Sequence, residues 1–207
     1  MSIVDGERLT FYTVRPGLAG DAPHGGVGAA GGATGAAGVV GAVGMCVCPG
    51  RSLPRARMSG WNRDLAADLD EVRDFGAAAL VTLMQGDELA DYSAPPAEKR
   101  REVLARGMAW YHLPIVDMCA PDDVFEGRWN AAGREQRALL NAGRNIAVHC
   151  LGGLGRTGTV AARLLVEYGE RPDLAVARVR DARPGAIQTY EQERYVLACA
   201  PLSCLTA

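Results

Sequence analysis

Short apolar runs alternate with amphipathic segments along most of the 207-residue chain. Apolar runs of strand length predict buried strands, and apolar residues spaced three and four positions apart predict helices with one buried face. The predicted strands cover residues 8–14, 39–47, 78–84, 109–115 and 145–149. Helices are predicted from an N-cap at Asn62 to Gly76, and over residues 95–106, 121–142, 157–168 and 172–182. Thr189 and Gln192 form a capping-box pattern that predicts a last helix. This alternation predicts an α/β domain with a central, mostly parallel sheet flanked by helices.

The composition changes sharply near the start of the chain. Residues 25–38 are almost entirely glycine and alanine, which bury little apolar surface. We therefore expect an N-terminal segment (1–38) with a short strand and a flexible Gly/Ala-rich insertion, one folded domain (39–200) and a C-terminal tail (201–207). Residues 25–48 carry no charge, but glycine and alanine supply too little transfer energy for a membrane segment. Because acidic residues precede this stretch, we expect no signal peptide and a cytoplasmic protein.

Charge and cysteine usage exclude several classes of protein. The net charge is −2, and basic and acidic residues are interspersed, so a nucleic-acid partner is not expected. The six cysteines are scattered through a chain that is large enough to form a core without disulfides. Cys46 and Cys48 do not have the spacing of a redox pair or a zinc knuckle. We expect free thiols in a reducing compartment and no bound metal.

One segment carries an unusual set of residues, the sequence VHCLGGLGRTGT at residues 148–159. A glycine-rich turn between a strand and a helix directs backbone N–H groups and the positive end of the helix dipole at one point, which makes an anion site. A dinucleotide fingerprint, G-x-G-x-x-G, matches residues 153–158, but it needs further strands that the rest of the chain does not supply. A Walker phosphate loop, G-x-x-x-x-G-K, needs a lysine after its last glycine. Arg156 follows Gly155 instead, and the glycine spacing also differs, so this interpretation is excluded.

A third interpretation uses every unusual residue, because Cys150, five intervening residues and Arg156 form a C-x5-R turn. Such a turn can wrap one tetrahedral phosphate, with its amides donating to the oxygens while the arginine adds a bidentate fork. The helix dipole and the arginine favour a reactive thiolate behind the phosphorus atom. A cysteine that only packs in the core is the alternative, but that role requires no arginine in the turn. The predicted phosphate-binding residues between these two are Leu151, Gly152, Gly153, Leu154 and Gly155.

These residues resemble a known family. The sequence HCLGGLGRTG (149–158) is similar to the H-C-x5-R-[S/T] signature of cysteine-based protein phosphatases. More narrowly, the chain resembles the kinase-associated phosphatase, or cyclin-dependent kinase inhibitor 3, family of dual-specificity-like enzymes. The other stretches that carry this resemblance are CPG (48–50), residues 62–84, LPIVD (113–117) and GAIQT (185–189). The resemblance implies the fold of these phosphatases and hydrolysis through a cysteinyl-phosphate intermediate, without a metal or other cofactor.

The resemblance also implies roles for individual side chains. Cys150 would attack phosphorus, and Arg156 would bind the phosphate and stabilise the transition state. Asp117 directly follows a predicted strand and matches the family's general acid, which gives a proton to the leaving group. Asp122 and Asp123 lie on the same loop and compete for this role. They are also near a predicted helix start, where an aspartate serves as a cap or a dipole partner.

Three further residues support the site in the same interpretation. His149 is expected to order the turn by hydrogen bonding, without giving a proton to the substrate. Thr157 either donates a hydrogen bond to the Cys150 sulfur or only caps the helix. Gln188 either positions the water that hydrolyses the intermediate or is a solvated loop residue.

The substrate class follows from what the turn lacks. Members of the family that hydrolyse inositol phosphates often have lysine in this turn, and no lysine lies between Cys150 and Arg156. The resemblance therefore favours a phosphoprotein substrate, phosphotyrosine with or without phosphoserine and phosphothreonine. Two alternatives stay open: a phosphatase of small-molecule or lipid phosphates, and a module that binds phosphopeptides without hydrolysing them. Lys99 is the only lysine of this Gly-, Ala- and Arg-rich chain. This composition is typical of a GC-rich genome such as a bacterial one, and it therefore argues against a kinase–cyclin partner. The sequence predicts no particular oligomeric state.

Overall fold

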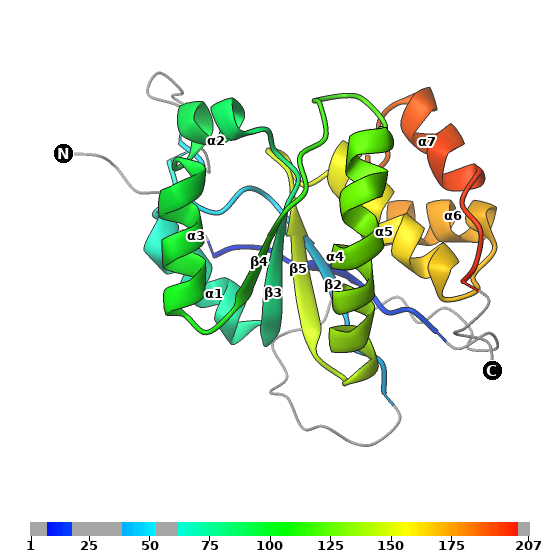
Figure 1. Cartoon of the computed structure of the whole chain (residues 1–207), viewed down its shortest axis with the longest axis horizontal. Helices are drawn as coiled ribbons and strands as arrows, with labels where there is room; N and C mark the ends of the chain where they lie inside the picture. Colours follow the sequence, from blue (N-terminus) through cyan, green and yellow to red (C-terminus); the bar gives the residue numbers. More distant parts are fainter. Residues whose placement is uncertain (1–7, 18–38, 53–61, 203–207) are drawn as a thin grey trace.

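A single sheet lies at the centre of the computed structural model, which describes residues 8–17, 39–52 and 62–202 (Figure 1). The expected insertion at residues 25–38 lies outside the described residues. Within them, the strands are β1 (Tyr12–Val14), β2 (Val43–Cys46), β3 (Ala77–Thr82), β4 (Ala109–His112) and β5 (Asn145–His149). Their order in the sheet is β1-β2-β5-β3-β4. β1 is antiparallel to β2 and the other pairs are parallel, which confirms the predicted mostly parallel sheet.

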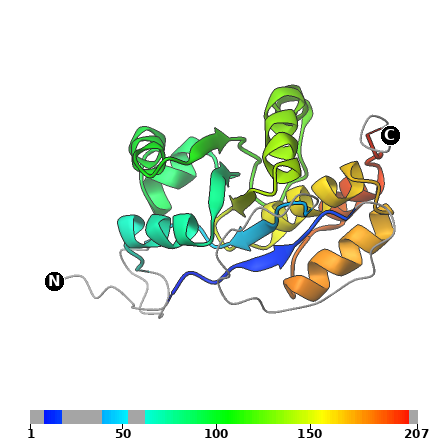
Figure 2. The same ribbon diagram turned by 90° about the horizontal axis from the view of Figure 1, so that it is seen from below.

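Helices cover both faces of this sheet (Figures 1 and 2). In the described part of the chain they are α1 (Leu65–Asp74), α2 (Gly86–Tyr92), α3 (Pro96–Ala105), α4 (Asp123–Asn141), α5 (Gly155–Glu167), α6 (Pro172–Ala182) and α7 (Tyr190–Leu197). α1 contacts β3 and α3 contacts β4, whereas α4 and α5 pack against β5 from the other side. α6 and α7 pack on α5. None of the described helices is long and apolar enough to cross a membrane.

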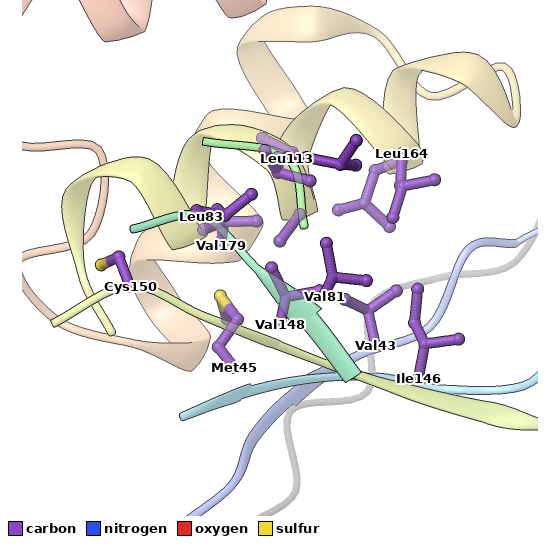
Figure 3. Packing of buried hydrophobic residues seen from close by; sticks show 14 of the residues in the cluster. Val43, Met45, Val81, Leu83, Leu113, Ile146, Val148, Cys150, Leu164 and Val179 are labelled. Atoms are coloured by element: carbon purple, nitrogen blue, oxygen red, sulfur yellow. The ribbon is translucent and has the colours of Figure 1, made fainter. Parts of the chain in front are cut away.

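Side chains alternate between the two faces along the central strands, as a sheet covered on both sides requires. Met45 and Val148 belong to the larger hydrophobic cluster, which includes residues of α4, α5 and α6. Cys46 and Ala147 belong to the smaller cluster, with residues of α1 and α3. Figure 3 shows Cys150 at the margin of the larger cluster, where β5 leaves the core. β5 therefore places Cys150 at the end of the core.

Some helix boundaries differ from the prediction because other side chains satisfy the first free N–H groups. Asp64, and not Asn62, is the N-cap of α1. Asp122 caps α4, which leaves Pro121 outside the helix. The short helix α2 has no counterpart in the sequence prediction. The predicted capping box at Thr189 is confirmed at the start of α7.

The parallel strands end at one edge of the sheet. His149, the last residue of β5, pairs in register with Cys46 of β2 on one side and Thr82 of β3 on the other. Thr82 pairs in turn with His112, the last residue of β4. Loops that follow the carboxyl ends of adjacent parallel strands meet at the same edge, which is where α/β sheets bind ligands. The segments after β2, β3, β4 and β5 therefore converge on one place.

Candidate active site

A tight turn at residues 150–156, the signature turn, connects β5 to α5 and begins with the buried Cys150. α5 starts at Gly155, two residues before the predicted start. Gly153 has a φ of +67°, and a Cβ there would lie 2.3 Å from the Cys46 carbonyl oxygen. Only glycine fits this position, because any other residue would be strained and would collide with the end of β2.

Hydrogen bonds hold the signature turn from its outer side. The Leu151 carbonyl accepts from the Cys48 N–H at 3.1 Å, and the Gly152 carbonyl accepts from Arg183 Nη2 at 3.3 Å. The N–H groups of residues 151–154 donate no hydrogen bond to any described residue. With the carbonyls bound outside, these amides are available to an anion inside the turn.

The Arg156 guanidinium is buried, and its contacts fix its orientation. Nη1 and Nη2 donate to the two carboxylate oxygens of Glu88 at 2.6 and 2.9 Å, and Nη1 also donates to the Ile115 carbonyl at 3.1 Å. Nη2 also lies 2.9 Å from Asp117 Oδ1. Burial by itself lowers the pKa of Arg156, but the hydrogen bonds to Glu88 and nearby negative groups outweigh burial and raise it. The guanidinium therefore stays charged.

These contacts leave one side of the guanidinium open to a ligand. Of its five N–H groups, three donate to Glu88 and Ile115, and Nη2 also lies within ion-pair distance of Asp117. Nε is buried and has no hydrogen-bond partner among the described residues. A phosphate would take the Nε–H and, by displacing Asp117, a second N–H on Nη2. Such a fork matches two oxygens of one phosphate.

His149 is completely buried next to the signature turn, and its hydrogen bonds define its tautomer. Nδ1 lies 3.2 Å from the Cys150 carbonyl oxygen, which can only accept, so Nδ1 carries the hydrogen. Nε2 accepts from the Thr82 hydroxyl at 2.8 Å, and Trp110 Nε1 donates to the same hydroxyl oxygen. Burial, followed by the charge of Lys99, holds the pKa of His149 well below its usual value. The neutral ring therefore positions the Cys150 backbone.

The structure separates the three candidate aspartates of the loop after β4. Asp117 forms the ion pair with Arg156, and its side chain is 62% exposed. Asp122 accepts a hydrogen bond from the Phe125 N–H at 2.8 Å as the N-cap of α4. Asp123 is exposed in the first turn of the same helix. Within the described contacts, Asp117 is the one of the three that reaches the signature turn.

Two further candidate residues lie beside the signature turn. Gln188 Oε1 accepts a hydrogen bond from the Gly155 N–H at 3.1 Å. Thr157 Oγ1 is buried and makes no hydrogen bond with a described residue, the Cys150 sulfur included. The fold therefore brings both residues to the site, but the expected bond from Thr157 to the sulfur is absent from the described contacts.

Glu88, which orients Arg156, is the site residue that the sequence analysis missed. It lies on α2, between β3 and α3, and its side chain also completes a capping box with Gln85. The signal in the sequence is the pair of acidic residues Asp87 and Glu88, which is typical of the first turn of a helix. The pattern does not point to an arginine 68 positions further along the chain.

Comparison with known proteins places this geometry in a family. The family model described as "Polymorphic toxin system, DSP-PTPase phosphatase" matches residues 56–170, more than half of the chain. The chain belongs to this family. This DSP-PTPase is thus a protein-tyrosine or dual-specificity phosphatase, and the signature turn lies within the matched region.

Curated relatives and solved structures agree with this assignment. Cyclin-dependent kinase inhibitor 3 of Rattus norvegicus is 31% identical over 148 residues, and that of Homo sapiens is 30% identical over 153 residues. Both alignments cover 70% of this DSP-PTPase and 68% of the relative. The structure of kinase associated phosphatase, with serine in place of its catalytic-site cysteine, matches with a TM-score of 0.65 and 28% identity over 75% of this chain and 83% of that one. Tk-PTP in its active form matches with a TM-score of 0.56 and 30% identity over 74% and 88% of the two chains. The resemblance to the kinase-associated phosphatase family is confirmed.

Proposed function

We propose that this phosphatase hydrolyses phosphorylated proteins with Cys150 as the nucleophile, Arg156 as the phosphate ligand and Asp117 as the general acid. The proposal rests on two sets of donors: the Arg156 guanidinium, which has an N–H group without a partner among the described residues, and the amides of residues 151–154, which donate no hydrogen bond within the described structure. This N–H group of the guanidinium, on Nε, is buried. A buried donor left unpaired costs about 1–3 kcal/mol, so the site favours a ligand that brings oxygen acceptors. One phosphate monoester supplies acceptors to the fork and to the amides together.

In the first step, the phosphate displaces the Asp117 carboxylate from Arg156 and takes the Nε–Nη2 fork. The Cys150 sulfur attacks phosphorus from the base of the turn, so that an S–P bond forms while the ester P–O bond breaks. Asp117 in its protonated form gives its proton to the departing oxygen. Arg156 and the amides stabilise the charge on the three remaining phosphate oxygens.

In the second step, water attacks phosphorus and the S–P bond breaks, which releases inorganic phosphate and restores the Cys150 thiolate. Asp117, now a carboxylate, takes a proton from the attacking water. Gln188 orients this water from its place at Gly155. Thr157, whose hydroxyl has no partner among the described residues, donates to the departing sulfur.

The proposed substrate is a phosphoprotein that carries phosphotyrosine, with or without phosphoserine and phosphothreonine. The absence of lysine between Cys150 and Arg156 supports this choice over inositol phosphates, which carry extra phosphate groups. Similarity to a kinase associated phosphatase also supports it. The five cysteines in the described part of the chain are free thiols, which suits a reducing cytoplasm.

Hydrolysis of p-nitrophenyl phosphate in the presence of EDTA tests the proposal. Cys150→Ser should abolish turnover, and Asp117→Asn should lower kcat by about 10²–10⁴-fold, the usual contribution of a general acid. Asp123→Asn, which changes an exposed carboxylate of the same region, is the control and should keep wild-type activity. An active serine variant would refute the assignment of Cys150. Binding of phosphopeptides without turnover, unaffected by Asp117→Asn, would support a non-catalytic module instead.

A further inference from the structure

Lys99 is the only lysine in the chain, and it is completely buried. It lies on α3, whose other buried residue is Val103. Moving an ammonium group out of water is costly unless hydrogen bonds and opposite charge compensate for the loss of hydration. The mechanism proposed above does not use this group, so its burial calls for a separate explanation.

All three hydrogens of the Lys99 ammonium have partners. Nζ donates to the Pro49 carbonyl at 2.9 Å, to Ser93 Oγ at 3.1 Å and to the Cys48 sulfur at 3.3 Å. The Ser93 hydroxyl in turn donates to the Pro49 carbonyl at 2.8 Å. No ion pair joins Lys99 to a carboxylate within residues 8–17, 39–52 and 62–202. Polar groups therefore solvate this charge, but no neighbouring carboxylate neutralises it.

Lys99 holds together two segments that support the active site. The first is the turn after β2, where the Cys48 N–H donates to the Leu151 carbonyl of the signature turn at 3.1 Å. The second is the end of α2, where Ser93 is the C-cap. α2 also carries Glu88, the carboxylate that orients Arg156. Lys99 therefore links the segment that holds the signature turn to the helix that holds Arg156.

The charge on Lys99 also acts at longer range. Burial is the main cause of the low pKa of His149, and the Lys99 charge is the next cause. Burial is likewise the main reason that the pKa of Cys46 is raised, and the Lys99 charge opposes that rise. His149 directly precedes Cys150, and Cys46 pairs with His149 across the sheet. The positive potential of Lys99 therefore reaches the residues next to the reactive sulfur.

Most other charges in this region are already paired. Asp68 of α1 accepts from the Gly50 N–H at 2.8 Å and pairs with Arg63 at 2.7 Å. The arginine of the signature turn is shared by two carboxylates. Lys99 is therefore a positive charge without a carboxylate of its own in the described structure.

We propose that Lys99 is a positioning residue of this phosphatase: its buried ammonium, through Cys48, Pro49 and Ser93, fixes the two segments that support the signature turn and the phosphate-binding arginine. The inference rests on the proposed role of Cys150 as the nucleophile. Without the ammonium, the Pro49 carbonyl keeps the Ser93 hydroxyl as a donor but the Cys48 sulfur loses its Lys99 donor, so the two segments lose their shared contact with Lys99.

The test compares Lys99→Met, which has a side chain of similar length without charge, with Arg100→Met, which removes an exposed positive charge from the same helix. The first measurement is the Kd of inorganic phosphate by calorimetry, which reports the geometry of the signature turn without turnover. The second is kcat/KM for p-nitrophenyl phosphate. Lys99→Met should weaken phosphate binding and lower kcat/KM by about tenfold each, because the turn and the arginine are no longer held in the productive geometry. Arg100→Met should leave both values unchanged.

A folded Lys99→Met variant that binds phosphate as tightly as the wild type would overturn the proposal. If Lys99→Met does not fold, Lys99→Arg and Lys99→Gln give the same contrast. The arginine variant should keep the phosphate affinity and the glutamine variant should lower it, whereas equal affinities, or folding with arginine alone, would overturn the proposal. Phosphate binding is measured without turnover, so an inactive wild-type enzyme that binds phosphate would count against the proposed function and leave this measurement intact.

Discussion

Replacing Glu88 by glutamine tests whether its ion pair with Arg156 is needed for catalysis. The Arg156 side chain is 1% exposed and that of Glu88 is 17% exposed, so solvent screens the pair poorly. The two hydrogen bonds of 2.6 and 2.9 Å are charge-assisted, and one such bond contributes about 1.5–3 kcal/mol. Glutamine keeps one oxygen acceptor but places an N–H group against the guanidinium and removes the compensating charge.

We expect Glu88→Gln to lower kcat/KM by about 100-fold, which corresponds to about 2.7 kcal/mol, because the guanidinium no longer presents its Nε–Nη2 fork in a fixed direction. The free energy of unfolding should fall by about 2 kcal/mol. Hydrolysis of p-nitrophenyl phosphate and urea unfolding measure the two effects. Asp91→Asn, an exposed carboxylate on the same helix, is the control and should change neither. Wild-type kcat/KM in a folded Glu88→Gln variant would refute this reasoning.

Two further predictions concern the signature turn and the histidine next to it. Gly153→Ala should lower kcat/KM at least tenfold and destabilise the fold by about 1–3 kcal/mol, because its φ is +67° and the new Cβ would meet the Cys46 carbonyl. Gly169→Ala, whose Cβ would meet nothing within 4 Å at a φ of +96°, should keep full activity, and equal losses of activity in the two variants would contradict the argument. Because burial lowers the pKa of His149 from 6.5 in the folded protein, the unfolded chain takes up this proton first as the pH falls. The stability that depends on neutral His149 is therefore full above about pH 6.5 and is lost below it, by up to about 1.4 kcal/mol per pH unit. Urea unfolding between pH 7.5 and 5 should show this slope in the wild type and a smaller one in His149→Gln; the same slope in both would count against a buried neutral ring.

The sequence by itself determined the signature turn and the class of fold. Cys150 and Arg156 are six positions apart, and the glycines between a strand and a helix permit a tight turn whose backbone can approach an anion closely, so the anion-binding turn follows from local sequence. Buried parallel strands are continuously apolar because helices cover both faces, and this pattern was sufficient to predict the α/β sheet. The Thr189 capping box is likewise local, and the structure confirms it.

Only the tertiary structure decided which distant residues complete the site. Glu88 precedes Arg156 by 68 positions, and Lys99 follows Cys48 by 51, and neither separation belongs to a periodic pattern. The contact of Arg156 with Asp117 also depends on where the loop after β4 lies, since the rival aspartate of that loop is occupied as a helix cap. The physical reason is that many strand orders satisfy the same apolar pattern, whereas the order β1-β2-β5-β3-β4 decides which loops meet at the edge of the sheet.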